Sequence, residues 1–516
     1  MNTQAFRVPA FRRTILAQGL LLALSLGANA GASDARIDSL SATPPAIAAW
    51  TGDGPSRRTA LDATSRDFRA VRSQHAAVLP PPGSVGMTNC NDAGPGSLRE
   101  VITNAVSGDT IDLTSVGCSA ITLTTGALIV TQNQLKLQGP TDGFTIGADD
   151  QSQVLAHFGN AYLTLDHMSI QNGAKYLTSP DASDARGGCI FSTGIVGLLY
   201  SEVTHCAAGT VGPTSAARGG AIYASGGVVL SASLVGDARA LSMTDSAGGA
   251  ISSPAAVALI NSVVTQGVAQ AQSGEAHAGG VDAGGEFIAQ SAAVLQNFAV
   301  TQDYLGSAGG VRAQGDVDII NSSFALNASI TGGGIEMRGS GFSRSIRNST
   351  IAGNIGPGVA GILAAGSDVK IANSSIAWNV KQLPGTGSGL FAEGVDIELQ
   401  STLIAFNGDP ETATYSDVDG GGTLSGSHNL IHTGHVSAPS DTIQNVDPLI
   451  VPAILDMSRV IIQLKPGSPA INGGSNPWSL DFDQRGVGFP REIGASTDIG
   501  SYEFDLGDLV FANSFD

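Results

Sequence analysis

Short runs of apolar, often β-branched residues recur along the chain, separated by glycine and by polar residues. Some runs follow a glycine pair, as in GGAI at 219–222 and 248–251, and others are middle runs such as VALI at 257–260. A third kind is flanked by amides, as in RNSTIAGN at 347–354. Runs of about four to eight such residues bounded by turn formers predict β-strands, and glycine permits the positive φ that a sharp corner needs.

The glycine pairs and the amide-flanked runs recur at nearly constant spacing. The glycine pairs begin at 187, 219, 248, 279, 309 and 332, and the amide-flanked runs at 261, 290, 321, 348, 373 and 400. Each repeat of roughly 25–30 residues therefore holds three short strands, like one coil of a parallel β-helix. We expect residues 85–455 to form an all-β, right-handed parallel β-helix, a pectate-lyase-like solenoid of about a dozen coils. A β-propeller, the alternative, needs roughly 40–50 residues per blade.

The repeats also predict which side chains carry the architecture. Apolar residues such as Ile351 face the shared core, glycines lie at corners, and the flanking amides stack on their counterparts in neighbouring coils. The length of the repeat varies slightly from coil to coil, and the extra residues are expected in loops at 172–186, 206–217 and 267–278. We assign structural roles of this kind to Gly219, Gly220, Gly248, Gly249, Asn348, Asn354 and Asn373.

Composition narrows the functional classes. The chain has 516 residues, 68 of them glycine, yet 42% are hydrophobic, so it is not a disordered glycine-rich polymer. Only 13% are charged and the net charge is −19. Nucleic acid is excluded as a partner, because binding phosphates requires a basic face. We expect a monomer without a cofactor.

The N-terminus predicts export. Three arginines precede a short apolar stretch at 14–27, and small residues supply a cleavage site at 28–30. This pattern predicts a signal peptide over 1–30, followed by a flexible leader over 31–84 that is rich in Ala, Ser, Pro and Asp. No later run reaches ~18 apolar residues, so the mature chain is expected to lack a transmembrane helix. The expected location is secreted or at the cell surface.

The chain has four cysteines, Cys90, Cys118, Cys189 and Cys206. An even number in an exported protein predicts two disulfides. Four cysteines allow three pairings, and proximity along the chain favours Cys90–Cys118 and Cys189–Cys206. None belongs to paired CxxC motifs of the kind that hold zinc.

Residues 89–113, NCNDAGPGSLREVITNAVSGDTIDL, resemble the opening cap of secreted bacterial β-helix proteins with a CSLREA-type start. The Ser-Leu-Arg-Glu core is Ser97–Glu100 here, although Cys90 does not directly precede Ser97. SLREVITNAV is the one predicted helix, and a helix there would cover the open first coil, as a solenoid requires.

Two further resemblances concern the repeats and the C-terminus. Gly219–Ile222 and Phe324–Asn327 are similar to the GGAI and FxxN repeats of polymorphic outer-membrane proteins. Asp483–Gly486 and Asp498–Glu503 resemble the Asp-Gln-Arg-Gly and Asp-Ile-Gly-x-x-Glu hallmarks of the choice-of-anchor Q module. The resemblance implies a bacterial secreted or surface β-helix whose family has no established reaction. It divides the end of the chain into a module over 456–505 and a tail of unassigned role over 506–516.

Within this module, Asp483 and Arg485 are expected to form a structural clasp, with Asp498 and Glu503 as further structural residues. A carboxylate–guanidinium pair at this point would seal the last coil. The alternative is that these side chains, with Asp481, hold a cation or a substrate.

Catalytic candidates are few. Asp149 and Asp150 are adjacent acids, but neighbouring strand residues point to opposite faces, so the pattern favours a polar turn. Arg344 and Arg347 belong to a basic cluster that, with Lys370, would stabilise the enolate of a lyase reaction. The alternative is a solvated surface, or arginines that bind loop carbonyls.

A metal site is a further candidate. His428, His432 and His435 lie close together in SHNLIHTGH, and Asp417 and Asp419 precede them. Histidine and carboxylate ligands suit a transition metal. The alternative is a last-coil strand followed by a turn, and we favour a chain without a metal.

The sequence therefore favours an exported β-helix that acts by binding. Its expected partner is an extracellular or cell-surface polysaccharide, or a host or envelope surface, contacted by adhesion or glycan binding. The alternative is a polysaccharide lyase or glycoside hydrolase. That alternative requires Arg344, Arg347 or Lys370 to meet carboxylates in a groove.

Overall fold

The computed structural model describes residues 83–179, 183–212, 214–301, 306–329, 332–381, 389–409, 412, 414–433, 437–455 and 459–505. The predicted signal peptide, almost all of the predicted leader and the tail over 506–516 lie outside the described residues.

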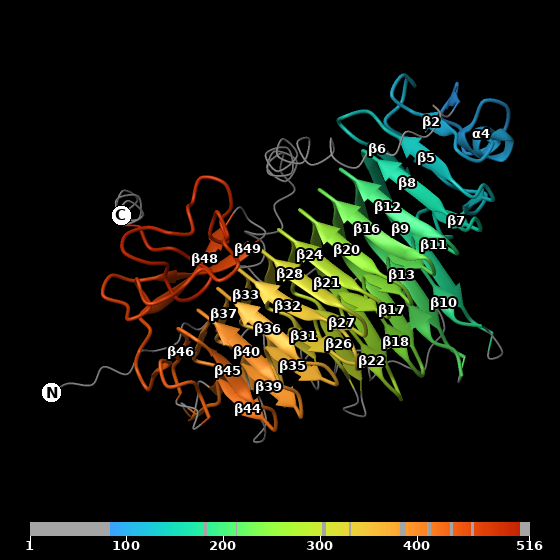
Figure 1. The fold of residues 1–516 in the computed structure, drawn as a ribbon. Helices are drawn as coiled ribbons and strands as arrows, with labels where there is room; N and C mark the ends of the chain where they lie inside the picture. Colours follow the sequence, from blue (N-terminus) through green and yellow to red (C-terminus); the bar gives the residue numbers. More distant parts are fainter. Residues whose placement is uncertain are drawn as a thin grey trace. The chain divides into compact units, whose positions relative to one another are not determined.

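Residues 84–444 wind into stacked coils whose strands pair in parallel with the same strand of the next coil (Figure 1), apart from one antiparallel pair between 408–409 and 414–415. One coil illustrates the path. It runs from β15 (Ile222–Ala224) through β16 (Gly227–Ser231) and β17 (Leu234–Ser242) to β18 (Ser246–Ala247), and the next coil then begins. The parallel β-helix expected from the repeats is therefore confirmed. We call the four sheets I to IV, in the order β16, β17, β15 and β18.

Sheet I contains 13 described strands and is the side that faces the viewer in Figure 1. Its strands, in order of pairing, are β1 (Ser84–Gly86), β2 (Thr110–Asp112), β5 (Leu135–Gln138), β8 (Tyr162–Asp166), β12 (Ile195–Leu199), β16, β20 (Val257–Ile260), β24 (Phe287–Gln290), β28 (Val317–Ile320), β32 (Arg344–Arg347), β36 (Val369–Ala372), β40 (Ile397–Gln400) and β45 (Leu424–Ser427).

Sheets III and IV precede sheet I in each coil. Sheet III contains β4 (Leu128–Val130), β7 (Leu155–His157), β11 (Ile190–Ser192), β15, β19 (Ile251–Ser253), β23 (Val281–Ala283), β27 (Val311–Ala313), β31 (Ile335–Met337), β35 (Ile362–Ala365), β39 (Leu390–Glu393) and β44 (Val418–Gly420). Sheet IV is short and contains β10 (Ala185–Arg186), β14 (Ala217–Arg218), β18 and β22 (Ala276–His277).

Sheet II follows sheet I around the coil and splits into two strands per coil after β21. It contains β3 (Ala120–Thr122), β6 (Phe144–Gly147), β9 (Met168–Leu177), β13 (Glu202–Thr210), β17, β21 (Val263–Ala271), β25 (Ala293–Leu295), β26 (Phe298–Thr301), β29 (Ser323–Ala325), β30 (Ala328–Ser329), β33 (Thr350–Ala352), β34 (Ile355–Gly356), β37 (Ser375–Ala377), β38 (Val380–Lys381), β41 (Leu403–Ala405), β42 (Gly408–Asp409), β43 (Thr414–Tyr415), β46 (Leu430–Ile431) and β47 (Ile443–Gln444).

The loops predicted at 172–186, 206–217 and 267–278 are wrong in large part, because β9, β13 and β21 extend into them. In β17, Ala238 and Ala240 are fully buried and alternate with the partly exposed Asp237 and Arg239. Alternating alanines bury little bulk, so their period-two pattern resembled loop composition.

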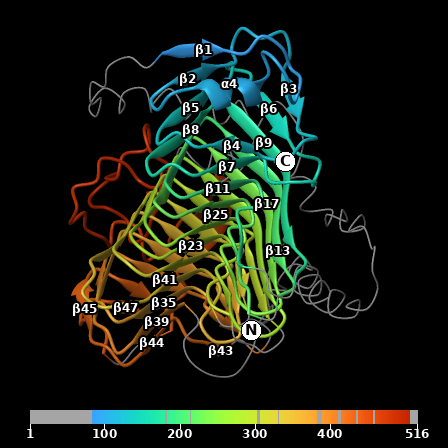
Figure 2. The same cartoon turned by 90° about the vertical axis from the view of Figure 1, so that its right-hand side faces the viewer.

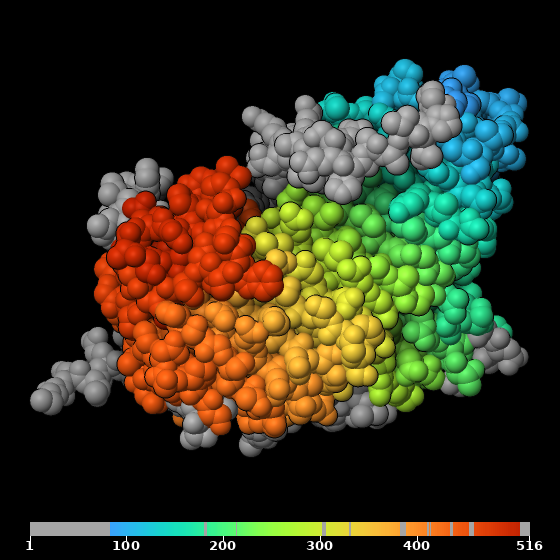
Figure 3. Space-filling model, in the orientation of Figure 1, coloured from blue at the N-terminus to red at the C-terminus, as the bar shows by residue number. Residues whose placement is uncertain are grey.

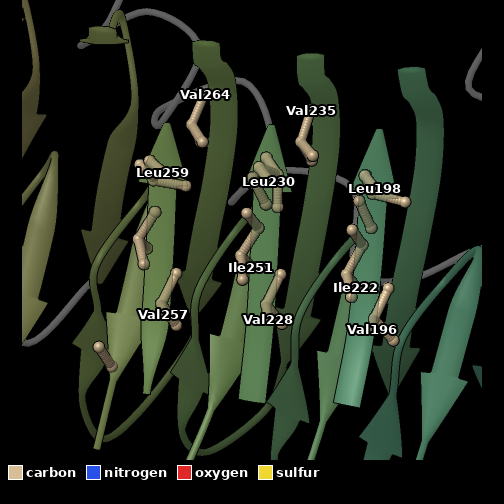
Figure 4. Packing of buried hydrophobic residues seen from close by; sticks show 14 of the residues in the cluster. Val196, Leu198, Ile222, Val228, Leu230, Val235, Ile251, Val257, Leu259 and Val264 are labelled. Atoms are coloured by element: carbon tan, nitrogen blue, oxygen red, sulfur yellow. The ribbon is translucent and has the colours of Figure 1, made fainter. Parts of the chain in front are cut away.

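The core is one continuous apolar cluster inside the coils. Identical or similar residues stack in register, as Val228 lies between Val196 and Val257 and Leu230 between Leu198 and Leu259 (Figure 4). These six side chains are fully buried. Because each coil shares this core with its neighbours, no coil buries its inward side chains alone.

A short helix closes the first coil. Helix α4 (Leu98–Asn104) lies at the end of the stack beside β2 (Figure 2) and buries Leu98, Val101 and Ile102. Its N-cap is Ser97, whose hydroxyl accepts a hydrogen bond from the Glu100 amide. The Gln132 side-chain amide donates to carbonyls at the other end of the helix, which satisfies orphan groups there.

Buried amides tie the later coils together at one corner of sheet II. Each Asn side chain donates from Nδ2 to Oδ1 of the next, at 2.7–3.0 Å. The ladder consists of Asn297, Asn327, Asn354, Asn379 and Asn407, and it ends on Asp417.

At the corner between sheets I and II, Asn321, Asn348 and Asn373 have positive φ values of 53°, 49° and 46°. Asn tolerates this left-handed conformation better than most residues do. Asn348 donates to Asn321 Oδ1 at 2.7 Å.

At the start of the glycine-pair strands, Gly219 and Gly248 have φ values of 63° and 58°. A Cβ on Gly220 or Gly249 would lie within 2.0–2.3 Å of a neighbouring backbone carbonyl oxygen. Only glycine fits these positions without a backbone shift.

Both disulfides are formed, with the pairing that proximity along the chain favours. Cys90 pairs with Cys118 and Cys189 pairs with Cys206. The second bridge is buried, whereas the first is only partly buried beside the N-terminal cap.

The C-terminal segment, residues 450–455 and 459–505, begins with an antiparallel hairpin of β48 (Ile450–Leu455) and β49 (Arg459–Leu464). The expectation that its clasp seals the last coil is wrong. The Gln484 side chain bonds to Thr350 and Ser323, Ser501 bonds to Ser375, and Gly500 donates to the Ser401 carbonyl. These residues belong to four successive coils, so the segment lies along the side of sheet II. The small hydroxyl residues there leave room for it.

Candidate functional site

The outer face of sheet I carries a group of polar side chains where the C-terminal segment meets the coils. Strands β32, β36 and β40 alternate between buried and outward residues, so Arg347, Lys370, Glu398 and Gln400 point outward. In register, Lys370 pairs with Glu398 and the next outward residues, Ala372 and Gln400, pair with each other. The β-period therefore brings these four side chains onto one surface.

Trp478, from the C-terminal segment, completes this surface. A pocket of about 230 Å³ is lined by Lys370, Ile371, Ala372, Glu398, Gln400, Pro477 and Trp478. We call this pocket, with the adjoining Arg347, the trough. Trp478 is 43% exposed. The Arg347 guanidinium lies over its indole ring, with Cζ 4.9 Å from the ring centroid. Figure 3 shows the C-terminal segment, in red, against the yellow and orange coils that form the other wall.

The charges of the trough are paired. The Arg347 guanidinium bonds to the Asp318 carboxylate, and Lys370 Nζ lies 3.1 Å from Glu398 Oε2. The hydrogen bond from Lys370 lowers the pKa of the Glu398 carboxyl. Gln400 also donates to Glu398, at 3.2 Å. The trough therefore offers hydrogen-bond donors, hydrogen-bond acceptors and an aromatic face, and its charged groups sum to no net charge.

Arg344 does not lie in the trough with Arg347 and Lys370. Its guanidinium is buried inside the coil, where it donates to the carbonyls of Ala365, Ser367 and Gly339 at 2.8–3.2 Å. Burial lowers its pKa. This is the geometry of an arginine that satisfies loop carbonyls, so the structure separates Arg344 from Arg347 and Lys370.

Asp149 and Asp150 lie in an exposed turn with φ values of 45° and 58°. Neither acid is among the residues that line the trough. The adjacent acids therefore form a polar turn far along the chain from the trough.

His428 and His432 contact different side chains. His428 is 3.8 Å from the Asp441 carboxylate, and His432 is 3.6 Å from Asp417 while it packs against Phe406 and Tyr415. His435 lies outside the described residues. Within the described part of the chain, no three His, Cys, Asp or Glu side chains are grouped so that they could hold a metal ion.

A second charged group, which sequence reasoning missed, lies where sheets III and IV meet. We call it the crease. Outward residues Asp282, Arg312 and Glu336 are stacked in register on β23, β27 and β31. Arg312 Nε donates to Asp282 at 2.7 Å, and Glu336 bonds to Arg338. Asp282 and Glu336 are only 5% and 4% exposed although they are on the outer face of the sheet.

His277 of sheet IV also faces the crease. Its Nε2 is 3.0 Å from Glu275, and its buried Nδ1 has no hydrogen-bond partner among the described residues. Burial, followed by the positive charge of Arg312, lowers the pKa of His277 to about 4. The signal for this cluster was present in the repeat itself. The glycine-pair motif reads GGCI and GGAI in three coils but GGVD and GGVR in the next two.

The predicted clasp residues lie within the C-terminal segment. Arg485 pairs with Asp483 at 2.7 Å and lies between the rings of Phe489 and Tyr502. Glu503 faces a different arginine, the fully buried Arg491, at 3.4 Å.

Asp498 supports the same network by accepting a hydrogen bond from the Phe504 amide. The pKa values of Asp498 and Glu503 are both raised by burial, that of Glu503 to about 8.

Comparisons with known proteins add little to this geometry. No family model matches the chain, and no curated protein matches it. Among solved structures, the crystal structure of pectate lyase Pel9A is similar at 14% identity and a TM-score of 0.41, over 82% of this chain and 98% of that chain. Likeness at this level assigns no function. No helix among the described residues is long and apolar enough to cross a membrane.

Proposed function

We propose that this protein is an exported, monomeric β-helix that binds a glycan through the trough. The observation that carries the proposal is the half-exposed Trp478 held beside Arg347, Lys370, Glu398 and Gln400. An aromatic face packs against the C–H face of a sugar ring, and paired donors and acceptors bind vicinal hydroxyls. No step of this proposal requires a metal or a cofactor.

Predictions from the sequence pattern and from resemblance support this proposal. A signal peptide over 1–30 accounts for export, and two disulfides suit an oxidising compartment. A CSLREA-like cap and a choice-of-anchor Q-like module over 456–505 are typical of bacterial surface proteins. In this proposal the module has a second role, because it supplies Trp478 to the trough.

The test is a glycan array followed by titration calorimetry with the glycans that bind. Trp478→Ala should weaken binding about tenfold or more, because it removes the aromatic face at the centre of the site. Tyr176→Ala, which removes an aromatic residue that is 51% exposed on β9, is the matched control and should bind like the wild type. Glycan binding that Trp478→Ala leaves unchanged would contradict the proposal.

A second candidate function is hydrolysis of the glycan at the crease. The observation that favours it is the pair of buried, outward-facing carboxylates on β23 and β31. Asp282 and Glu336 are two strand spacings apart, so their backbone positions are separated by about 9.5 Å. Inverting glycosidases hold their two carboxyl groups roughly 6.5–9.5 Å apart.

In this candidate mechanism Asp282, whose pKa burial raises, protonates the leaving oxygen as the glycosidic C–O bond breaks. Glu336 takes a proton from the water that attacks the anomeric carbon. The products are two sugar chains, one with a new reducing end, and the water is consumed. Asp282→Asn and Glu336→Gln should abolish the release of reducing ends, whereas Asp237→Asn, an exposed carboxylate of sheet II, should not.

Three outcomes are distinguishable. Reducing ends from a bound glycan support hydrolysis, and no products from any bound glycan leave binding as the function. An ultraviolet-absorbing product from a uronate polymer would contradict both and establish lyase chemistry.

A further inference from the structure

The outer face of sheet I carries an apolar strip that ends at the trough. Strands β8 to β28 each place at least one apolar side chain on this face, where most of them are partly exposed. The strip consists of Tyr162, Ile195, Leu199, Val229, Ala258, Ile260, Ile288 and Ile320. Tyr162 is 46% exposed and Val229 is 37% exposed.

The strip follows the stacking direction of the coils. Val229, Ala258 and Ile288 form one line in register, and that line continues through Asp318 and Ser345 to Lys370. A second line runs from Ile260 through Gln290 and Ile320 to Arg347. Both lines therefore lead directly from the strip into the trough.

This arrangement departs from the rule for a solvated sheet face. Sheets with one face in water usually alternate apolar inward residues with polar outward ones, and contiguous apolar surface marks an interaction site. No outward residue of the four strands β12, β16, β20 and β24 is charged. On the described strands of sheet I, charged outward residues occur only beyond the ends of this part of the strip.

We propose that the ligand of the trough is an uncharged polysaccharide that lies extended along the stacking direction and covers the apolar strip. The inference rests on the proposed glycan binding and specifies its ligand. The trough has no net charge because Arg347 and Lys370 are paired with Asp318 and Glu398. The strip adds apolar contact for sugar C–H faces, and aromatic rings lie at both ends, Tyr162 on β8 and Trp478 beside β36.

The length of the surface selects a polymer. Nine successive strands, β8 to β40, separate the two ends, and eight strand spacings correspond to about 38 Å. A short oligosaccharide in the trough would leave most of this surface uncovered. A long chain would gain contact with each coil that it crosses.

The experiment takes a neutral glycan that binds in the array and prepares its oligosaccharides from disaccharide to decasaccharide. Calorimetry on the full chain then compares their affinities. Affinity should rise with length, by about tenfold or more across the series. Ile288→Asp, in the middle of the strip, should cancel this gain and leave disaccharide binding unchanged. Leu363→Asp, an outward apolar residue on sheet III, is the matched control. Equal thermal midpoints of the two variants would exclude a folding defect as the cause.

The outcomes separate this inference from the proposed function. If disaccharide and decasaccharide bind equally well, or if a polyuronate binds more tightly than the neutral polymer, the extended neutral ligand is wrong although the trough still binds glycan. If sedimentation shows a dimer that Ile288→Asp dissociates, the strip is an interface between two copies instead. If no glycan binds, or Trp478→Ala has no effect, the proposed function fails together with the inference.

Discussion

At the scale of single residues, the amide ladder shows how a polar side chain becomes part of a core. Asn354 is fully buried, accepts hydrogen bonds from the backbone and side-chain amides of Asn327, and donates to Asn379 and to the Phe324 carbonyl. All of its hydrogen-bonding groups are satisfied, so its burial costs little. The same residue without its neighbours would be strongly destabilising.

Asn354→Ala should therefore lower the free energy of unfolding by about 2–4 kcal/mol, because it leaves the amides of Asn327 and the Oδ1 of Asn379 with fewer partners in the core. Urea denaturation measures this as a lower midpoint. Asn160→Ala is the control, because Asn160 is exposed, and its effect should stay within about 0.5 kcal/mol. Similar midpoints for both variants would show that the ladder is not stabilising.

Glu503 predicts a pH dependence. Burial raises its pKa to about 8 from the usual 4.5, so between these values the folded protein binds a proton that the unfolded chain has released. Its contribution to stability is complete below about pH 4.5 and is lost as the pH rises through about 8. The thermal midpoint should fall over this range, and Glu503→Gln should flatten the slope. A midpoint that rises with pH equally in both proteins would contradict this assignment.

At the scale of elements, the C-terminal segment explains a detail of the repeats. The residue after Asn-Ser in the amide-flanked runs is Ser323, Thr350 or Ser375, and each faces outward from sheet II into the C-terminal segment. Their hydroxyls bond to Gln484 or Ser501. Small hydroxyl residues were thus a signal for a covering segment, although the sequence did not say which one.

Thr350→Ile should loosen this contact. The Thr350 hydroxyl donates to Gln484 Oε1 at 2.5 Å, and its loss leaves a fully buried amide oxygen without that partner, at a cost of about 1–3 kcal/mol. We expect faster limited proteolysis within residues 459–505 and an unchanged digestion of the coils. Thr164→Ile on β8, which faces solvent on sheet I, should not alter the digestion. Equal rates for both variants would mean that Thr350 does not hold the segment.

At the scale of the whole molecule, covalent links are confined to the N-terminal half of the β-helix. Cys90–Cys118 joins the cap region to the first coil, and Cys189–Cys206 crosses one coil. Later coils contain the amide ladder instead. The bridges therefore fasten the cap to the first coil and brace one coil internally, whereas the amide ladder links successive coils.

The bridges should differ in their response to a mild reductant. Cys90 and Cys118 are partly exposed, whereas Cys189 and Cys206 are 0% and 3% exposed. Because thiol–disulfide exchange requires access to a sulfur, the first bridge should open first under native conditions. Alkylation and mass spectrometry measure this order. Full reduction should then lower stability by roughly 3 kcal/mol per bridge. Simultaneous opening of both bridges would contradict the order expected from burial.

The repeat determined much of this architecture by itself. Strands that bury one face must alternate, and coils that share a core must repeat, so the spacing predicted the parallel β-helix and core residues such as Ile351. The capping helix was expected instead from residues 97–106, which lie outside the repeats. The pairing of cysteines followed from short separations along the chain. Even the crease left a trace, as charged residues in the glycine-pair motif of two coils.

Only the tertiary structure decided where the sites lie. Trp478 reaches Arg347 and Lys370 because the C-terminal segment folds back along sheet II, through contacts such as that of Asn373 with Ser475, 102 residues apart. Local patterns carry no information about such distant pairings, since they depend on which surfaces remain uncovered once the coils have stacked. Arg344 differs in this respect, because the two-residue period of its strand turns it inward while Arg347, three residues later, faces outward. The sequence by itself determined the repeating coil. Tertiary packing decided which residues outside the repeat pattern, such as Arg347, Lys370 and Trp478, come together in a site.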